Sequence, residues 1–181
     1  MPAEHLIPGF FGKIPATGDF VARRLDREFV HFWDRLAARH LAAWQRDDLW
    51  PANLGVRFLL RLERSGPVAG VAIPSFDRVG RRFPLAAAAP SPHAGLETIA
   101  ATGTWFDRIQ DILVAGRDRE TDADALAEDL ASQPFPRLLP STSRPFRHML
   151  FWTDGMSPIE ASPEAPREAL EELFATVREA G

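Results

Sequence analysis

Residues 74–84 hold the densest group of side chains in the chain that could do chemistry. Guanidinium groups bind carboxylates and phosphates through planar, paired hydrogen bonds, so three of them in one loop suit an acidic surface or a phosphorylated residue of a partner. The same arginines could instead pair with Asp77 and Asp19 and fix two loops against each other. Both interpretations stay open here. The polar members of the segment are Ser75, Asp77, Arg78, Arg81 and Arg82.

Ser75 is the strongest candidate nucleophile because it lies in a glycine-containing loop close to Asp77. It lacks the Gly-x-Ser-x-Gly elbow, and no histidine is adjacent in sequence. A triad can draw its histidine from a distant segment, so a small hydrolase using Ser75 or a carboxylate pair is an alternative. We predict instead that Ser75 and Asp77 bond to local backbone groups and shape the turn, with no catalytic residue in the chain.

The remaining motifs of metal and cofactor chemistry are missing from the sequence. There are no cysteines, which excludes disulfides and thiolate zinc sites. His31 and His40 are nine residues apart on one expected helix, which places them on opposite faces. Lys13 is followed by Ile14-Pro15, so the glycine-rich segment around it is not a phosphate-binding P-loop. We therefore predict no metal and no cofactor.

Composition sets further limits on partner and compartment. At 181 residues and 45% hydrophobic content, the chain is expected to form a single domain spanning 1–181. Its net charge of -4 gives no general affinity for nucleic acid. No apolar stretch approaches the roughly 18 to 20 residues that cross a bilayer, and Met1–His5 do not resemble a signal peptide. We expect a cytoplasmic protein with no stable membrane insertion.

The hydrophobic pattern predicts alternating groups of strands and helices. Residues 7–20 are expected to form a short strand followed by an irregular loop, and residues 26–46 an amphipathic helix capped by Asp26. Strands follow at 56–62, 67–73 and 83–89, the first with one buried face and one partly wet face. Helices are expected at 96–113 and 121–132, the latter with a Thr121/Asp124 capping box. A buried strand at 147–153 and a helix starting at Ser162-Pro163 complete the chain.

This order of elements predicts the fold class. Consecutive strands in the middle of the chain imply antiparallel pairing, and the strict alternation of a doubly wound parallel sheet is absent. The prediction is an α+β fold: a mixed, mostly antiparallel sheet packed by helices.

Several motifs together resemble a known family. They are Pro-Gly-Phe-Phe-Gly-Lys-Ile-Pro at 8–15, Gly-Asp-Phe-Val at 18–21, the aromatic helix with Phe29 and Trp33, the loop at 74–85, and Phe-Trp-Thr-Asp-Gly at 151–155. In these motifs the chain resembles the TagF family of type VI secretion system accessory proteins. The resemblance extends over most of the chain.

The resemblance implies a function that the residues alone do not. Members of the family are understood as cytoplasmic proteins that act after translation to restrain assembly or firing of the secretion system. In some systems they act through a forkhead-associated-domain scaffold protein, and some carry a fused phosphatase, for which this chain is too short. The expected role is a non-catalytic negative regulator, and a chaperone for a secretion subunit remains an alternative.

The family does not say which residues touch the partner, so the arginine argument alone selects them. We expect the contact surface near Arg78, Arg81, Arg82, Asp77, Lys13 and Asp19.

Overall fold

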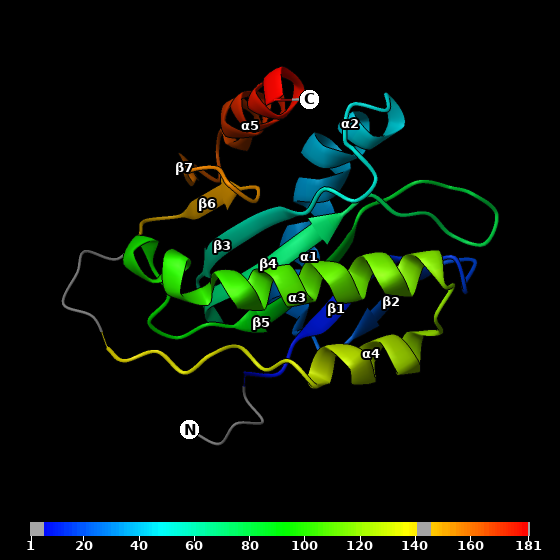
Figure 1. Ribbon diagram of the computed structural model, residues 1–181, viewed down its shortest axis with the longest axis horizontal. Helices are drawn as coiled ribbons and strands as arrows, with labels where there is room; N and C mark the ends of the chain where they lie inside the picture. The colour runs from blue at the N-terminus through cyan, green and yellow to red at the C-terminus, as the bar shows by residue number, and fades with distance from the viewer. Residues whose placement is uncertain (1–5, 141–145, 181) are drawn as a thin grey trace.

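One antiparallel sheet of seven strands organises the residues that the structure describes (Figure 1). The computed structural model describes residues 6–140 and 146–180, so Met1–His5, on which the signal-peptide expectation rests, lie outside it. The strand order is β2-β1-β5-β4-β3-β6-β7. The strands are β1 (Gly9–Lys13), β2 (Phe20–Arg23), β3 (Val56–Leu62), β4 (Gly66–Ile73), β5 (Leu85–Pro90), β6 (Met149–Trp152) and β7 (Ile159–Ala161).

The predicted α+β class is confirmed, and every strand pairing within the described residues is antiparallel. The predicted interior strands are present, and the alanine-rich 85–90 segment is a strand rather than a helix. The two edge strands, β2 and β7, were not predicted. β2 is four residues long and mostly exposed, and β7 has only three residues, so neither carries a clear alternation of apolar and polar residues that marks a strand in sequence.

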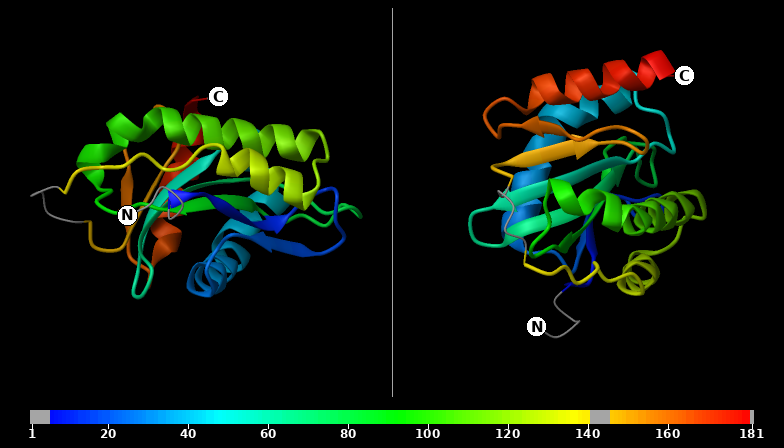
Figure 2. Two further views of the ribbon diagram at one scale, coloured as in Figure 1. Left: turned by 90° about the horizontal axis from the view of Figure 1, so that it is seen from below. Right: turned by 60° about the vertical axis from the view of Figure 1, so that its left-hand side comes forward.

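Helices cover both faces of the sheet, as Figure 2 shows. Helices α3 and α4 pack over one face, whose core includes Leu59 and Ala87. The other face lies under α1, η2, α2 and α5, with Phe58 and Ala88 in its core. The helical segments are α1 (Arg27–Leu36), η2 (Ala37–Leu41), α2 (Ala42–Arg46), η3 (Leu96–Thr98), α3 (Ile99–Asp118), α4 (Ala123–Ala131) and α5 (Pro166–Ala180).

Two-sided coverage corrects the prediction for the strand at 56–62. One face was expected to be partly wet, but Arg57 and Leu59 are both buried because α3 lies over them. Only Arg61 on that face is exposed. Strand β5 is also covered on both faces. Its alanines contribute alternately to the core on one face of the sheet and to the core on the other.

The first long helix starts where the sequence predicts. The side chain of Asp26 accepts a hydrogen bond from the backbone N–H of Phe29 at 3.0 Å, and Trp33 stacks on Phe58 with ring centroids 4.4 Å apart. The helix is not continuous to residue 46, because a π-helical turn, η2, interrupts it. Buried aromatic stacking fixes α1 against the sheet.

Two predicted helix starts are wrong. Asp122, not Thr121, caps α4, and its carboxylate accepts from the N–H groups of Asp124 and Ala125. Helix α5 starts at Pro166 rather than Pro163. None of the helices in the described residues is long and apolar enough to cross a membrane.

Candidate functional site

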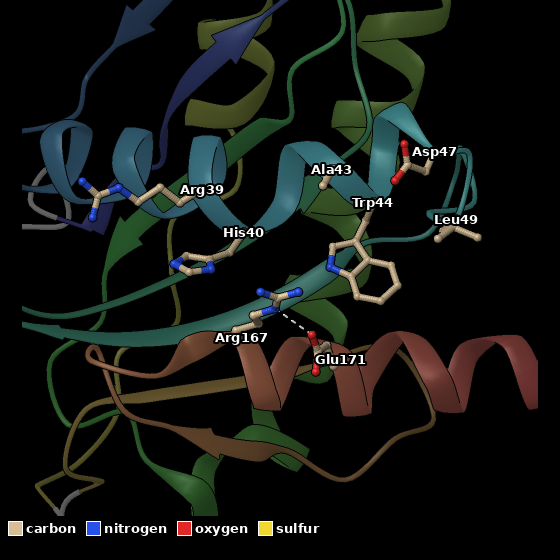
Figure 3. Close-up of a pocket in the computed structure, with 8 residues that line it drawn as sticks. All are labelled: Arg39, His40, Ala43, Trp44, Asp47, Leu49, Arg167 and Glu171. Atoms are coloured by element: carbon tan, nitrogen blue, oxygen red, sulfur yellow. Dashed lines mark hydrogen bonds and ion pairs between the residues drawn. The ribbon is translucent and has the colours of Figure 1, made fainter.

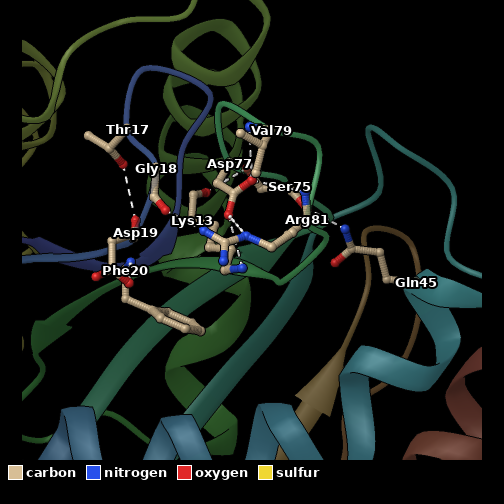
Figure 4. Close-up of polar contacts among 10 residues, drawn as sticks. All are labelled: Lys13, Thr17, Gly18, Asp19, Phe20, Gln45, Ser75, Asp77, Val79 and Arg81. Carbon is tan, nitrogen blue, oxygen red and sulfur yellow. Dashed lines mark hydrogen bonds and ion pairs between the residues drawn. The ribbon is translucent and has the colours of Figure 1, made fainter.

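The arginine loop (residues 74–84) and the N-terminal bend (residues 14–19) lie side by side at one end of the sheet (Figure 4). The N-terminal bend follows β1 and the arginine loop precedes β5, and these two strands are antiparallel neighbours. The backbone N–H of Arg78 donates to the carbonyl of Thr17 at 2.8 Å. The hydroxyl of Ser75 donates to the carbonyl of Lys13 at 2.7 Å. The two loops therefore form one surface, although more than 60 residues separate them in the chain.

Asp77 is the centre of this surface although it is itself buried, with 1% of the residue exposed. Its carboxylate lies 3.1 Å from the ammonium of Lys13 and accepts a 2.8 Å hydrogen bond from the Nε–H of Arg81. It also accepts from the backbone N–H groups of Val79 at 3.1 Å and Arg81 at 2.9 Å. Four donors thus converge on one carboxylate and close the loop around it.

These donors decide the charge of Asp77. Burial on its own would raise the pKa of the carboxyl, because it penalises the charged form. The hydrogen bonds from Arg81 and Lys13 outweigh burial and hold the pKa of Asp77 well below its ordinary range. Asp77 is therefore a structural anion, not a proton donor near neutral pH.

The three arginines are exposed, but each is also bonded to a neighbouring carbonyl. Arg78 donates to Ala16, Arg81 to Gly18, and Arg82 to Gln45 at 3.0 Å. Arg82 also pairs with Asp48 at 2.6 Å. Internal bracing, one of the two interpretations of the arginines, is thus observed, and it leaves their outer faces accessible to a partner.

The structure separates the six predicted contact residues into two groups. Lys13 and Asp77 are buried and position the loop from beneath. The exposed members are Asp19 and the three arginines. Asp19 makes no ion pair within the described residues; its carboxylate accepts from the adjacent N–H of Phe20 at 2.7 Å.

Apolar side chains at this surface were not singled out in the sequence. Val79 at the loop tip is 71% exposed, and Phe20 and Phe76 are 44% and 41% exposed. The ring of Phe20 packs edge-on against Phe83 and lies 5.0 Å from the Lys13 ammonium. The surface therefore combines cations with exposed apolar groups, which is the composition of protein interfaces.

A groove of about 600 Å³ runs beside the arginine loop. Arg117 forms part of it, a buried guanidinium that donates to the carbonyl of Pro74 at 2.9 Å and to Asn53 Oδ1 at 2.8 Å. Gln45 is also buried there and donates to the carbonyl of Ser75. Neither Arg117 nor Gln45 was predicted. In sequence, a polar residue near the end of a helix resembles an ordinary surface residue.

The groove does not assemble a catalytic serine. Ser75 lines it, but the residue is only 1% exposed and its hydroxyl is committed to the Lys13 carbonyl. None of the described residues that line the groove is a histidine. Within the described part of the chain, no three histidine or carboxylate side chains are grouped to hold a metal ion.

A second concavity of about 370 Å³ lies between the η2–α2 segment and α5 (Figure 3). Trp44 forms one wall and stacks on Phe174 with ring centroids 4.6 Å apart. Arg167 pairs with Glu171 at 2.7 Å. Burial, with the nearby Arg39 and Arg167, lowers the pKa of His40. The imidazole is therefore kept neutral more readily than an exposed one.

The comparisons with known proteins place this site in a family. Residues 9–133 match the family described as the TagF N-terminal domain, type VI secretion system-associated. The chain belongs to the TagF family. The match includes the N-terminal bend and the arginine loop, so both loops lie inside the matched TagF N-terminal domain. No protein with curated annotation matches the chain.

Among solved structures, the TagF chain is similar to PA0076 from Pseudomonas aeruginosa PAO1, known from a crystal structure. The two share 27% sequence identity with a TM-score of 0.61. The similarity covers 92% of this TagF chain and 78% of PA0076.

Proposed function

We propose that the chain is a non-catalytic cytoplasmic regulator that restrains assembly or firing of a type VI secretion system after translation. It does so by binding a component of the system, such as its forkhead-associated-domain scaffold protein. The exposed face of the arginine loop and the N-terminal bend is the proposed contact surface. Membership in the type VI secretion-associated family and the residues of this face support the proposal.

The observation that carries the proposal is the way the loop is built. A buried carboxylate with four donors holds a tip on which Val79 and the three arginines are exposed to solvent. Such bracing reduces the conformational entropy that a loop loses on binding. It leaves Arg78, Arg81 and Arg82 available for carboxylates or a phosphorylated residue of the partner.

A pull-down with the scaffold protein tests the surface directly. Val79→Asp places a charge at the exposed tip without removing any loop hydrogen bond, and Arg78→Ala removes one outward guanidinium. Both are expected to weaken capture of the scaffold by about tenfold or more. Leu139→Asp is the matched control, because Leu139 is 87% exposed and lies outside the two loops. Undiminished capture by both loop variants would remove this surface from the proposal.

A measurement in cells separates restraint from chaperoning. Deleting the gene is expected to raise secretion while the abundance of the system's components stays constant. Expression of the wild-type protein in the deletion strain is expected to restore restraint of secretion, and expression of Val79→Asp is not. A fall in one component's abundance on deletion would instead support the chaperone alternative.

Ester or phosphoester turnover that is lost in Ser75→Ala would support the hydrolase alternative.

A further inference from the structure

A second charged surface lies far from the arginine loop, along α1 and the end of β3. It is a groove of about 670 Å³, here named the α1–β3 groove. The turn that joins β3 to β4 forms one end, where Leu62 pairs with Gly66. The arginine loop begins after Ile73, at the other end of β4, and eight residues of strand correspond to roughly 26 Å. The two surfaces are thus at opposite ends of one strand.

Basic side chains outnumber acidic ones among the described residues of this groove. Arg27, His31 and Arg35 are spaced four residues apart, which places them on one face of α1. Arg61, Arg64 and His148 face them from the strand side. All six residues are exposed. Among the described residues that line the groove with them, two are carboxylates, Glu28 and Glu63.

The arginines of the groove differ from the paired arginines elsewhere in the described residues. In residues 6–140 and 146–180, none of these four arginines forms an ion pair, whereas eight other arginines do. Glu28 is already used: it accepts from the hydroxyl of Ser65 at 2.8 Å and from the N–H of Arg64 at 3.1 Å. With four arginines and two glutamates in its lining, the groove carries an excess of positive charge on a protein with a net charge of -4.

One of the cations is held in place. The Nε–H of Arg61 donates to the carbonyl of Phe146 at 3.2 Å, and its guanidinium lies 5.2 Å from the centre of the Phe146 ring. A stacked guanidinium keeps its other N–H groups free for a carboxylate. Apolar surface next to it comes from the half-buried Phe32 and the exposed Pro163. A partner segment could therefore bury apolar groups while its carboxylates meet the arginines.

We propose that the α1–β3 groove binds an acidic, aspartate- or glutamate-rich segment of a partner protein. Charge complementarity carries this choice. A nucleic acid is disfavoured because the chain as a whole has a net charge of -4 and would repel a long polyanion outside the groove. The inference does not depend on the arginine loop, whose residues lie at the other end of β4.

The test uses a short fluorescein-labelled peptide of alternating glutamate and serine, with binding followed by fluorescence anisotropy. Arg27→Glu/Arg35→Glu is expected to weaken binding by about tenfold or more, and added salt should weaken wild-type binding. The matched control is Arg119→Glu/Arg137→Glu, which makes the same charge change at exposed arginines outside the groove. This control should weaken binding by less than about twofold.

Three outcomes would overturn the proposal: no binding of the peptide, equal weakening by the control, or tighter binding of single-stranded DNA through the same arginines. Arg27→Gln/Arg35→Gln serves as the second variant if the glutamate variant does not fold, as judged by circular dichroism. It is expected to weaken binding in the same direction by about threefold or more.

Discussion

The ammonium of Lys13 lies 3.1 Å from a carboxylate oxygen of Asp77, and both side chains are almost fully removed from solvent. Lys13 ends β1, and Asp77 lies within the arginine loop, 64 residues later. Lys13 is also the sole lysine of the chain. The ion pair therefore joins the N-terminal bend to the arginine loop from beneath, while arginines provide the outer surface.

Asp77→Asn is expected to loosen the arginine loop. The neutral amide keeps the size of the side chain but leaves Lys13 buried beside an uncharged group, which is unfavourable. We expect the melting temperature to fall by on the order of 5 to 10 °C, measured by calorimetry. Asp19→Asn is the control, because that carboxylate is exposed and makes no ion pair in the described residues. Equal melting temperatures for wild type and Asp77→Asn would mean that the ion pair is unimportant for stability.

The same carboxylate predicts an acid-sensitive stability. The pKa of Asp77 is lowered in the folded protein. The ionised carboxylate therefore contributes fully to the stability of the fold above its unfolded pKa of about 3.9. It is lost as the pH falls from there toward the folded pKa. Wild type should lose more stability than Asp77→Asn between about pH 4.5 and pH 2.5 in urea unfolding. Parallel curves for the two proteins would assign the acid sensitivity to other carboxylates.

Sequence reasoning found the surface but not how it is held. The arginines and glycines of residues 74–84 and the motif at 8–15 were evident as polar, glycine-rich bends, and their proximity is observed. That Asp77 is buried, and that Arg117 bonds to Pro74 from α3, depends on contacts between segments far apart in the chain. Side-chain spacing carries no information on such contacts. Likewise, Arg57 in β3 was expected on a wet face, and only the packing of α3 over it explains its burial.

Gly12 is predicted to be irreplaceable in β1. Its φ is 143°, and a Cβ added there would lie 2.3 Å from the carbonyl oxygen of Pro84. That oxygen belongs to the backbone of Pro84, directly before β5, and cannot move aside as the end of a flexible side chain could. Gly12→Ala should lower the free energy of unfolding by on the order of 2 kcal/mol or more, measured in urea.

Gly18→Ala is the matched control for this substitution. Apart from Gly18 and its two chain neighbours, no described residue has an atom within 4 Å of a Cβ added at Gly18, which is in the neighbouring bend. Its effect on the free energy of unfolding should stay within about 0.5 kcal/mol. If both alanine variants are equally stable, β1 and β5 are not packed as closely at Gly12 as the structure has them.

His40 predicts a second pH dependence, near neutrality. Its pKa is lowered in the folded state by burial and by Arg39 and Arg167, so protonation is more favourable in the unfolded chain. Stability should therefore fall as the pH drops below the ordinary histidine pKa of about 6.5. His40→Gln should lose less stability than wild type between about pH 7 and pH 5. A variant His40→Gln that loses as much stability as wild type over this range would contradict the cause given for His40.

Arg117 connects three segments beneath the groove, and a lysine cannot replace it. Its guanidinium donates at once to backbone carbonyls of Ala52 and Pro74 and to the side chain of Asn53. A lysine keeps the charge but lacks the planar fork that reaches all three. Arg117→Lys should therefore cost on the order of 2 to 3 kcal/mol of unfolding free energy in urea. Arg119→Lys, two residues later and exposed, should cost less than about 0.5 kcal/mol. Because Arg117 bonds to Pro74 at the start of the arginine loop, its loss should also make that loop more susceptible to limited proteolysis; cleavage at the wild-type rate would show that the arginine loop does not need this support.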